Sequence, residues 1–365
     1  MDGGPVRIGL IGCGNVSRQY LLNIAGRPGL VVVACADIVP ESALSVSREF
    51  GIQQVCTVDQ LLAHPHVDLV LNLTLPIVHA AISLRALDAG KHVYSEKPFA
   101  LSVEDARSIL ELARERGLQV GCAPDTFMGV GIRACAELIQ LGELGTLVAA
   151  NAFMMNAGPE RFHPSPEFLY RQGAGPLLDI GPYYATALVE LLGPVARVGS
   201  LGSTTRSVRT ILSGDRAGTS FPVETPTHIV SLLQFGSGAL GTLVTSFDVA
   251  HTRTPRLEIH GTEGSIVASA ANSWAGPVLL KRAGDDDFVE IPLDPTVPDG
   301  GYLGMGLVEM ASAVRHGRAP VASGERALHV LEVLVAILDS TSSGGSFADI
   351  HSSPATRSGA RQDAR

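Results

Sequence analysis

Residues 6–26 read VRIGLIGCGNVSRQYLLNIAG: an apolar strand pattern, a Gly-Cys-Gly turn and a helix pattern. In such a turn one glycine allows the tight bend, the next lets backbone N–H groups approach a pyrophosphate, and the helix N-terminus supplies partial positive charge. Ser17 stands where a third glycine usually permits close helix packing. The residues that this pattern predicts to contact a dinucleotide are Gly12, Gly14, Asn15 and Val16.

A second apolar strand pattern, LVVVACADI, follows at residues 30–38 and contains Asp37 near its end. Asp37 lies about 20 residues after Ser17, which is where an acid binds the adenosine ribose hydroxyls in dinucleotide folds. No basic residue adjoins it, and the nearest one that follows is Arg48. We therefore expect NAD(H) as cofactor in preference to NADP(H). The alternative is a capping or turn role for Asp37.

The order of strand and helix patterns divides the chain into two domains. Over residues 5–127 the two patterns alternate, which predicts an α/β Rossmann domain with a doubly wound parallel sheet. Over residues 128–345 strand patterns dominate between Gly, Ser and Pro turns, which predicts an α+β domain with a large, mainly antiparallel open sheet. One hairpin is expected through Gly236-Ser237-Gly238. Residues 352–365 contain little to bury and are expected to be a disordered tail.

Composition excludes several classes of protein. The 365 residues are 45% hydrophobic and 17% charged with a net charge of -9, and no basic stripe is visible, so nucleic acid is not expected as a partner. Apolar runs do not reach the length of a membrane span. The five cysteines lack disulfide-framework or zinc spacing, which favours a reducing, cytoplasmic compartment. The spacing of His, Cys and carboxylate residues predicts no metal site.

Residues 71–100 read LNLTLPIVHAAISLRALDAGKHVYSEKPFA. This stretch resembles the signature of the glucose-fructose oxidoreductase, inositol dehydrogenase and rhizopine catabolism (Gfo/Idh/MocA) family, in which Thr-Pro and His precede a helix, Ala-Gly-Lys-His and Glu-Lys-Pro. One departure is Leu75, which separates the threonine from the proline. The resemblance covers about residues 5–345. The cofactor contacts that it implies are Thr74, Pro76, His79, Glu96 and Lys97.

Lys97 is a candidate catalytic residue on the residues alone. It follows an apolar strand, at the rim where open α/β sheets bind ligands, and an ammonium partly removed from water there suits proton transfer. A surface lysine paired with Glu96 is the alternative interpretation. The family resemblance implies that this lysine contacts the reacting hydroxyl and precedes a cis-proline.

A second candidate site lies in LLDIGPYYAT, residues 177–186. We expect a helix that starts at Pro182 and ends before Gly193-Pro194. Tyr184 then lies on a core-facing side, while Tyr183 lies in the first turn beside Asp179, which is placed in the preceding loop.

The same residues extend the resemblance. The family motif here is Asp-x-Gly-x-His or, in a minority, Asp-x-Gly-x-Tyr, and Asp179, Gly181 and Tyr183 match the tyrosine form. Some members carry a further Asp where this chain has Thr186. His163, in the loop segment ERFHPSPEFLY, is a candidate substrate contact or else a solvated histidine. Two weaker candidates for substrate contact are Asp125 and His251.

The expected function is that of an NAD(H)-dependent dehydrogenase or reductase that interconverts a secondary alcohol and a ketone on a sugar, cyclitol or related polyol. Tyr183 is the predicted base, and the positive charge of Lys97 is expected to lower the pKa of its phenol. Asp179 is expected to orient the pair or relay the proton. The predicted substrate contacts are Lys97, His163, Asp179 and Tyr183.

Two alternatives use the same fold. One is a redox-neutral, NAD-dependent glycosidase or lyase-type enzyme that retains its cofactor. The other is a non-catalytic sugar sensor that binds NAD. The resemblance also implies a homo-oligomer, a dimer or a tetramer.

Overall fold

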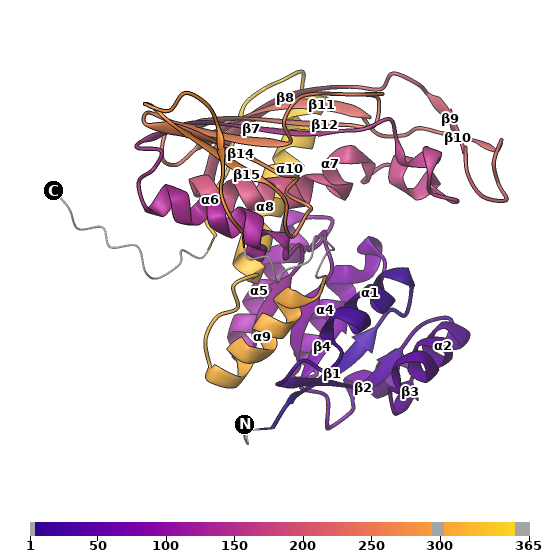
Figure 1. The fold of residues 1–365 in the computed structure, drawn as a ribbon. Coiled ribbons are helices and arrows are strands. Elements are labelled where there is room, and N and C mark those ends of the chain that lie inside the picture. The colour runs from indigo at the N-terminus through magenta and orange to yellow at the C-terminus, as the bar shows by residue number, and fades with distance from the viewer. Residues whose placement is uncertain (1–3, 294–302, 355–365) are drawn as a thin grey trace.

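The structure is a computed structural model that describes residues 4–293 and 303–354. Figure 1 shows two sheets at opposite ends of the molecule with helices between them. Most of the tail predicted to be disordered, residues 355–365, lies outside the described residues, and residues 352–354 form no regular element. No helix in the described part of the chain is both long and apolar enough to cross a bilayer.

The first sheet has six strands, all paired in parallel, in the order β3-β2-β1-β4-β5-β6. Its strands are β1 (Val6–Ile11), β2 (Leu30–Ala36), β3 (Gln54–Cys56), β4 (Leu69–Asn72), β5 (His92–Ser95) and β6 (Val120–Cys122). The helices are α1 (Asn15–Ile24), α2 (Pro40–Phe50), α3 (Val58–Leu62), α4 (His79–Asp88) and α5 (Val103–Arg116). The predicted doubly wound Rossmann sheet is therefore confirmed.

Both faces of this sheet are buried, because alternate residues of a strand point to opposite sides. In β4, Leu69 and Leu71 belong to a core cluster that also contains residues of α1 and α2. Val70, between them, belongs to a second cluster with residues of α4 and α5. Continuous apolar strands of this kind form parallel sheets covered by helices on both sides.

The second sheet has nine strands in the order β16-β15-β14-β13-β7-β12-β11-β8-β17. Its strands are β7 (Leu147–Met155), β8 (Val195–Ser203), β11 (His228–Phe235), β12 (Leu240–Ser246), β13 (Leu257–Gly261), β14 (Gly264–Ala268), β15 (Val278–Arg282), β16 (Val289–Glu290) and β17 (Ala348–Asp349). Neighbours pair antiparallel except β7 and β12, which are parallel. The large, mainly antiparallel sheet is thus confirmed.

The hairpin predicted at residues 236–238 joins β11 to β12, with Gly238 at φ 90°. A short two-stranded ribbon, β9 (Val208–Thr210) and β10 (Ser220–Pro222), extends beyond the sheet at one side of Figure 1.

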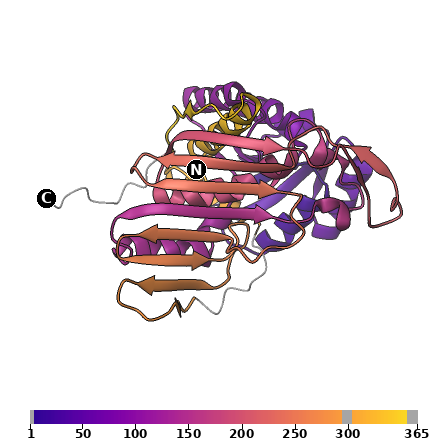
Figure 2. The ribbon, with the colours of Figure 1, turned by 90° about the horizontal axis from the view of Figure 1, so that it is seen from above.

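One face of the second sheet is covered and the other is open. Helices α6 (Val130–Gln140), α7 (Gly175–Asp179), α8 (Gly181–Leu192) and α10 (Gly324–Ser342) lie beneath it, and Figure 2 looks onto the uncovered face. Apolar side chains of its strands are exposed, among them Leu201 at 63%, Leu232 at 53% and Leu240 at 60%.

Two helices late in the chain pack against the first sheet and its helices. Helix α9 (Met305–His316) packs against β6 and α1, and α10 packs against α5 as well as α8 and β8. The boundary between residues 127 and 128 stays a prediction.

Asp125 fixes the start of α9. One of its carboxylate oxygens accepts hydrogen bonds from the backbone N–H groups of Gly304 (3.0 Å) and Gly306 (2.8 Å). Its side chain is buried, so the weak expectation of a substrate contact is replaced by a capping role. Burial, together with the charge of Glu96, raises the pKa of Asp125 to about 6.

The Asp125 carboxyl makes unfolding depend on pH in a defined direction. Its folded pKa of about 6 lies above its ordinary value of 3.8, so the folded chain takes up this proton first as the pH falls. The carboxyl therefore weakens the fold as the pH rises from about 4 to about 6. As the pH rises over that range, we expect the free energy of unfolding of Asp125→Asn, measured with urea, to increase by about 2 to 3 kcal/mol relative to that of wild type. Asp88→Asn, at an exposed ion pair with Arg116, is the control. A pH-independent difference for Asp125→Asn would contradict this account.

Two glycines of the first turn provide a matched pair. Gly12 has φ 98°, and a Cβ there would lie 2.4 Å from the carbonyl oxygen of Leu73, whereas a Cβ on Gly14 would have no atom within 4 Å. Gly12→Ala should lower the free energy of unfolding by about 3 kcal/mol or more, because the strain of a positive φ adds to the clash with the backbone. Gly14→Ala should melt close to wild type. Equal melting temperatures for the two variants would show that the turn is not strained as described.

Candidate active site

The glycine turn leads from β1 into α1. Gly14 is the N-cap residue of α1 and no side chain caps the helix, so its first backbone N–H groups are open to a ligand, while that of Ser17 donates to the carbonyl oxygen of Gly14 (3.2 Å). Ser17 is buried and its hydroxyl donates to the carbonyl oxygen of Gly14 (2.6 Å). Asn15 and Val16 are exposed in the first turn. The open space over Gly14 forms a cradle that fits the pyrophosphate of a dinucleotide.

Asp37 lies directly after β2, at the same edge of the sheet. Its carboxylate accepts hydrogen bonds from the backbone N–H groups of Cys13 (2.7 Å) and Val39 (2.8 Å). These bonds fix the carboxylate beside the glycine turn. The next residue, Ile38, is 90% exposed and offers an apolar surface next to that carboxylate.

The segment after β4 carries three of the predicted cofactor contacts. The Thr74 hydroxyl donates to the side-chain oxygen of Asn72 (2.7 Å), and Pro76 begins an exposed 3-10 turn. His79 is buried, with its ring nitrogens 3.0 Å from the carbonyl oxygen of Thr74 and 2.7 Å from that of Pro98. Its side chain therefore braces two loops, which the sequence did not reveal.

Glu96, Lys97 and Pro98 follow β5. The Lys97–Pro98 peptide bond is cis, as the resemblance implied. One carboxylate oxygen of Glu96 accepts the backbone N–H of Lys97 (2.9 Å), and the other accepts the hydroxyl of Tyr20 (2.8 Å). The Lys97 ammonium does not pair with Glu96, so the alternative interpretation of this lysine is wrong.

Lys97 instead contacts Asp179 across the two domains. Its ammonium donates to the backbone carbonyl oxygen of Asp179 (2.7 Å) and to a side-chain carboxylate oxygen (3.1 Å). The Lys97 and Asp179 side chains are only 18% and 25% exposed. Asp179 ends helix α7, which corrects its expected place in a loop. An ammonium has three N–H donors, so the third is available to a substrate.

Tyr183 lies beside this pair. Helix α8 begins at Gly181, one residue before the predicted start, and the Tyr183 ring centroid is 5.4 Å from the Lys97 ammonium. Tyr184 is 1% exposed and packs in the core, as expected.

The protonation of Tyr183 differs from the expectation. Burial raises the pKa of its phenol well above the ordinary value, and the carboxylates of Glu96, Asp179 and Asp125 raise it further. The expected lowering by Lys97 is therefore wrong. The ammonium lies near the ring and donates two hydrogen bonds to Asp179, so its charge is largely offset by that carboxylate.

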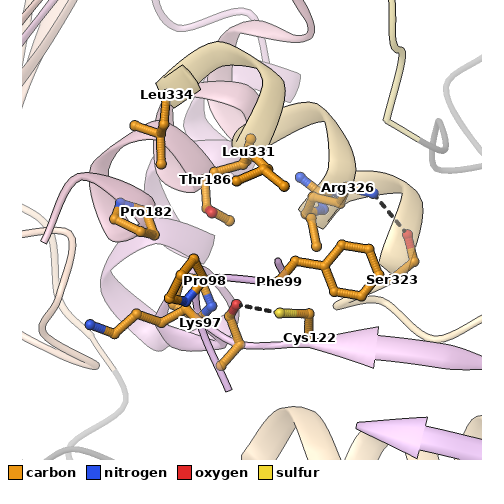
Figure 3. Close-up of a pocket in the computed structure, with 14 residues that line it drawn as sticks. Lys97, Pro98, Phe99, Cys122, Pro182, Thr186, Ser323, Arg326, Leu331 and Leu334 are labelled. Atoms are coloured by element: carbon orange, nitrogen blue, oxygen red, sulfur yellow. Dashed lines mark hydrogen bonds between the residues drawn. The ribbon is translucent and has the colours of Figure 1, made fainter. Parts of the chain in front are cut away.

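A small cavity lies behind the Lys97–Pro98 bond. It measures about 20 Å³, room for about one water molecule, and it is lined by residues that include Pro182, Thr186 and Arg326. Figure 3 shows the Lys97 ammonium pointing away from Thr186 and Arg326. A sugar-sized molecule does not fit this cavity, so the reacting groups face the other side of the loop.

The remaining candidates are less connected. The contacts that the structure gives the His163 ring are with the backbone N–H of Ser165 (3.0 Å) and with the Phe168 ring, and none joins it to Lys97, Asp179 or Tyr183 in the described part of the chain. His251 is exposed in the segment between β12 and β13. Among residues 4–293 and 303–354 no group of three or more His, Cys, Asp or Glu side chains could hold a metal ion.

One residue of the site was missed entirely. Tyr20 is fully buried on the face of α1 that also holds Ser17, Leu21 and Ile24. Its place in an apolar helical stripe is typical of a packing residue. The available signal was its hydroxyl, because a buried phenol usually has a hydrogen-bond partner.

Comparison with known proteins identifies both domains. Residues 6–123 match the family described as "Oxidoreductase family, NAD-binding Rossmann fold", and residues 132–267 match the GFO/IDH/MocA C-terminal domain. A 1,5-anhydro-D-fructose reductase of Ensifer adhaerens is 27% identical over 343 residues, which are 93% of this chain and 97% of the relative. A dTDP-3,4-didehydro-2,6-dideoxy-alpha-D-glucose 3-reductase of Saccharopolyspora spinosa is 30% identical over 302 residues, 80% of this chain and 84% of the relative.

Further similarity extends over almost the whole chain. The scyllo-inositol 2-dehydrogenase (NAD(+)) of Bacillus subtilis (strain 168) is 27% identical over 346 residues, 93% of this chain and 95% of that protein. The structure of a levoglucosan dehydrogenase in complex with NADH and L-sorbose has the same fold, with TM-score 0.83 and 21% identity over 96% of this chain and 100% of that one. With both family domains matched in order and a 30% identical relative over most of its length, the chain belongs to the Gfo/Idh/MocA family of oxidoreductases.

Proposed function

We propose that this chain interconverts a secondary alcohol and a ketone on a sugar, a cyclitol or a related polyol, with a nicotinamide cofactor. The observation that carries the proposal is the Lys97 ammonium, which two hydrogen bonds to Asp179 orient beside the Tyr183 phenol. Relatives that are named as an anhydrofructose reductase and an inositol dehydrogenase support this substrate class. His163 is also proposed as a substrate contact.

The Lys97 ammonium and the Tyr183 phenol act on the reacting oxygen in different ways. The free N–H of Lys97 donates to the carbonyl oxygen of the ketone, which draws electron density from the carbon. Tyr183 holds its proton, because its pKa is raised, and passes it to the same oxygen as the alcohol forms. A nicotinamide cofactor, with its pyrophosphate held at the glycine turn, would supply the hydride. Solvent then returns the proton to Tyr183.

The protonation of Tyr183 favours reduction. A phenol with a raised pKa carries its proton near neutral pH, so the proton is in place for donation and little phenolate is present to act as a base. In the oxidative direction the phenol oxygen of Tyr183 must instead carry a negative charge near Glu96 and Asp179. The Lys97 ammonium is then the compensating cation. We therefore propose ketone reduction as the faster direction near neutral pH.

A panel assay tests the function. Sugars, inositols and their keto forms are offered with NADH, NADPH and the oxidised cofactors, and nicotinamide absorbance is followed. We expect turnover of at least one keto form that requires added reduced cofactor. Binding of polyols without any change in the nicotinamide would contradict the proposal.

The two adjacent tyrosines test the proton carrier. Tyr183→Phe and Lys97→Met should each lower kcat for reduction by about 10² to 10⁴, since each removes a group that acts on the reacting oxygen. Tyr184→Phe is the matched control, because that ring lies in the core one position along the same helix. Its kcat should stay near that of wild type. Near-normal turnover by Tyr183→Phe with intact NADH binding would refute the assignment.

We also propose that NAD(H) is preferred over NADP(H). The Asp37 carboxylate is held at the edge where the adenosine ribose binds in this fold, and it would repel a 2′-phosphate. The nearby Arg18 is occupied by Glu49 (3.0 Å) and Ser45 (3.1 Å), which makes it a poor partner for that phosphate.

Asp37→Ser should shift the cofactor preference. Without the carboxylate, the ratio of kcat/KM for NADPH to that for NADH should rise about tenfold or more, because one unfavourable charge contact is removed. Glu41→Gln, which removes a carboxylate from the first turn of α2, is the control and should leave the ratio unchanged. A wild-type preference for NADPH would contradict the role given to Asp37.

A homo-oligomer, dimer or tetramer, and a cytoplasmic location complete the proposal. The homo-oligomer is supported by exposed apolar side chains on the open face of the second sheet, such as Leu201 and Leu232. Covering this apolar surface with a second copy of the chain would remove it from water. Support for the cytoplasmic location comes from the five unpaired cysteines, which suit a reducing compartment. Sedimentation of the purified protein tests the assembly.

A further inference from the structure

We propose that Tyr20 is a positioning residue for Lys97, acting through Glu96. The proposal rests on the function given to Lys97 above. Tyr20 lies in α1, the helix whose first turn forms the dinucleotide cradle, whereas Lys97 lies after β5. Tyr20 thus connects helix α1 to the residue that carries the reacting ammonium.

Hydrogen bonds to the backbone and to the side chain of Lys97 make this connection. The Tyr20 hydroxyl donates to one carboxylate oxygen of Glu96 at 2.8 Å, and the other oxygen accepts the Lys97 backbone N–H at 2.9 Å. The Lys97 ammonium then donates to Asp179 at 2.7 and 3.1 Å. Tyr20 is fully buried, so water cannot replace its hydroxyl from outside.

The two carboxylate oxygens of Glu96 accept different hydrogen bonds. One is held by Tyr20, and this leaves the other to anchor the backbone of Lys97. Without the Tyr20 hydroxyl the Glu96 carboxylate loses one of the two hydrogen bonds that fix its orientation. We expect Glu96 to turn, the anchor on the Lys97 backbone to loosen, and the ammonium to lose its fixed place on Asp179.

The neighbourhood provides a matched comparison. Tyr94, in β5, is also fully buried in the same core cluster, but its hydroxyl has no hydrogen-bond partner in the described part of the chain. Tyr94→Phe and Tyr20→Phe therefore make the same chemical change, one oxygen removed from a buried ring. Only the second removes a hydrogen bond that leads to Lys97.

Lysine labelling reads the position of Lys97 directly. The chain has three lysines, Lys91, Lys97 and Lys281, so acetylation of each can be followed by mass spectrometry on the cofactor-free protein, with two internal references. In Tyr20→Phe we expect Lys97 to be acetylated about threefold faster or more relative to Lys281, the effect of losing one hydrogen bond. Tyr94→Phe should label like wild type.

Kinetics supply the second readout. Tyr20→Phe should lower kcat about tenfold, while the Kd for NADH by fluorescence titration stays within about twofold of wild type, because a hydrogen bond to a charged group is lost and the cradle itself is intact. Equal kcat losses in Tyr20→Phe and Tyr94→Phe would overturn the proposal.

The labelling arm needs neither substrate nor cofactor. An unchanged Lys97 rate in folded Tyr20→Phe, judged by its melting temperature, therefore overturns the positioning role even if no substrate is found. Absence of turnover in wild type, with faster Lys97 labelling in Tyr20→Phe, would instead leave the positioning intact and contradict the proposed function.

Discussion

The contact between the Lys97 ammonium and Asp179 is the interaction on which the site depends. It joins the end of β5 in the parallel sheet to the end of α7 under the antiparallel sheet, and both side chains are largely removed from water. Ion pairs gain in strength where water is excluded, provided that their hydrogen bonds are satisfied. Two of the three lysine donors are used in this contact, and the third is the one proposed to meet the substrate oxygen.

The charges around this pair determine which proton chemistry is available. Glu96, Asp125 and Asp179 all act on Tyr183, and together with burial they keep its phenol protonated. The site therefore places an oriented ammonium next to a protonated phenol. Both suit an oxygen that gains negative charge, which is the oxygen of a ketone that receives a hydride.

Much of this arrangement was predictable from local sequence signals. Glycine turns such as Gly12-Cys13-Gly14 and Gly236-Ser237-Gly238 predicted the first βα unit and the β11–β12 hairpin, because positive φ and close approach require glycine there. Contacts between distant segments were not predictable in this way. The cap that Asp125 provides for α9 and the bond between Tyr20 and Glu96 join residues far apart in the chain, and no periodicity encodes such pairs. The pKa of Tyr183 was misjudged for the same reason, since it depends on which carboxylates lie nearby.

The most direct test of the account is a double-mutant cycle on Lys97 and Asp179. Lys97→Met, Asp179→Asn and the double variant are compared by kcat/KM for ketone reduction, with NADH binding and melting temperature measured for each. If Asp179 acts by holding the ammonium, the double variant loses no more activity than Lys97→Met alone. Losses that multiply in the double variant would show that the two residues act independently, and would contradict the central role given to their contact.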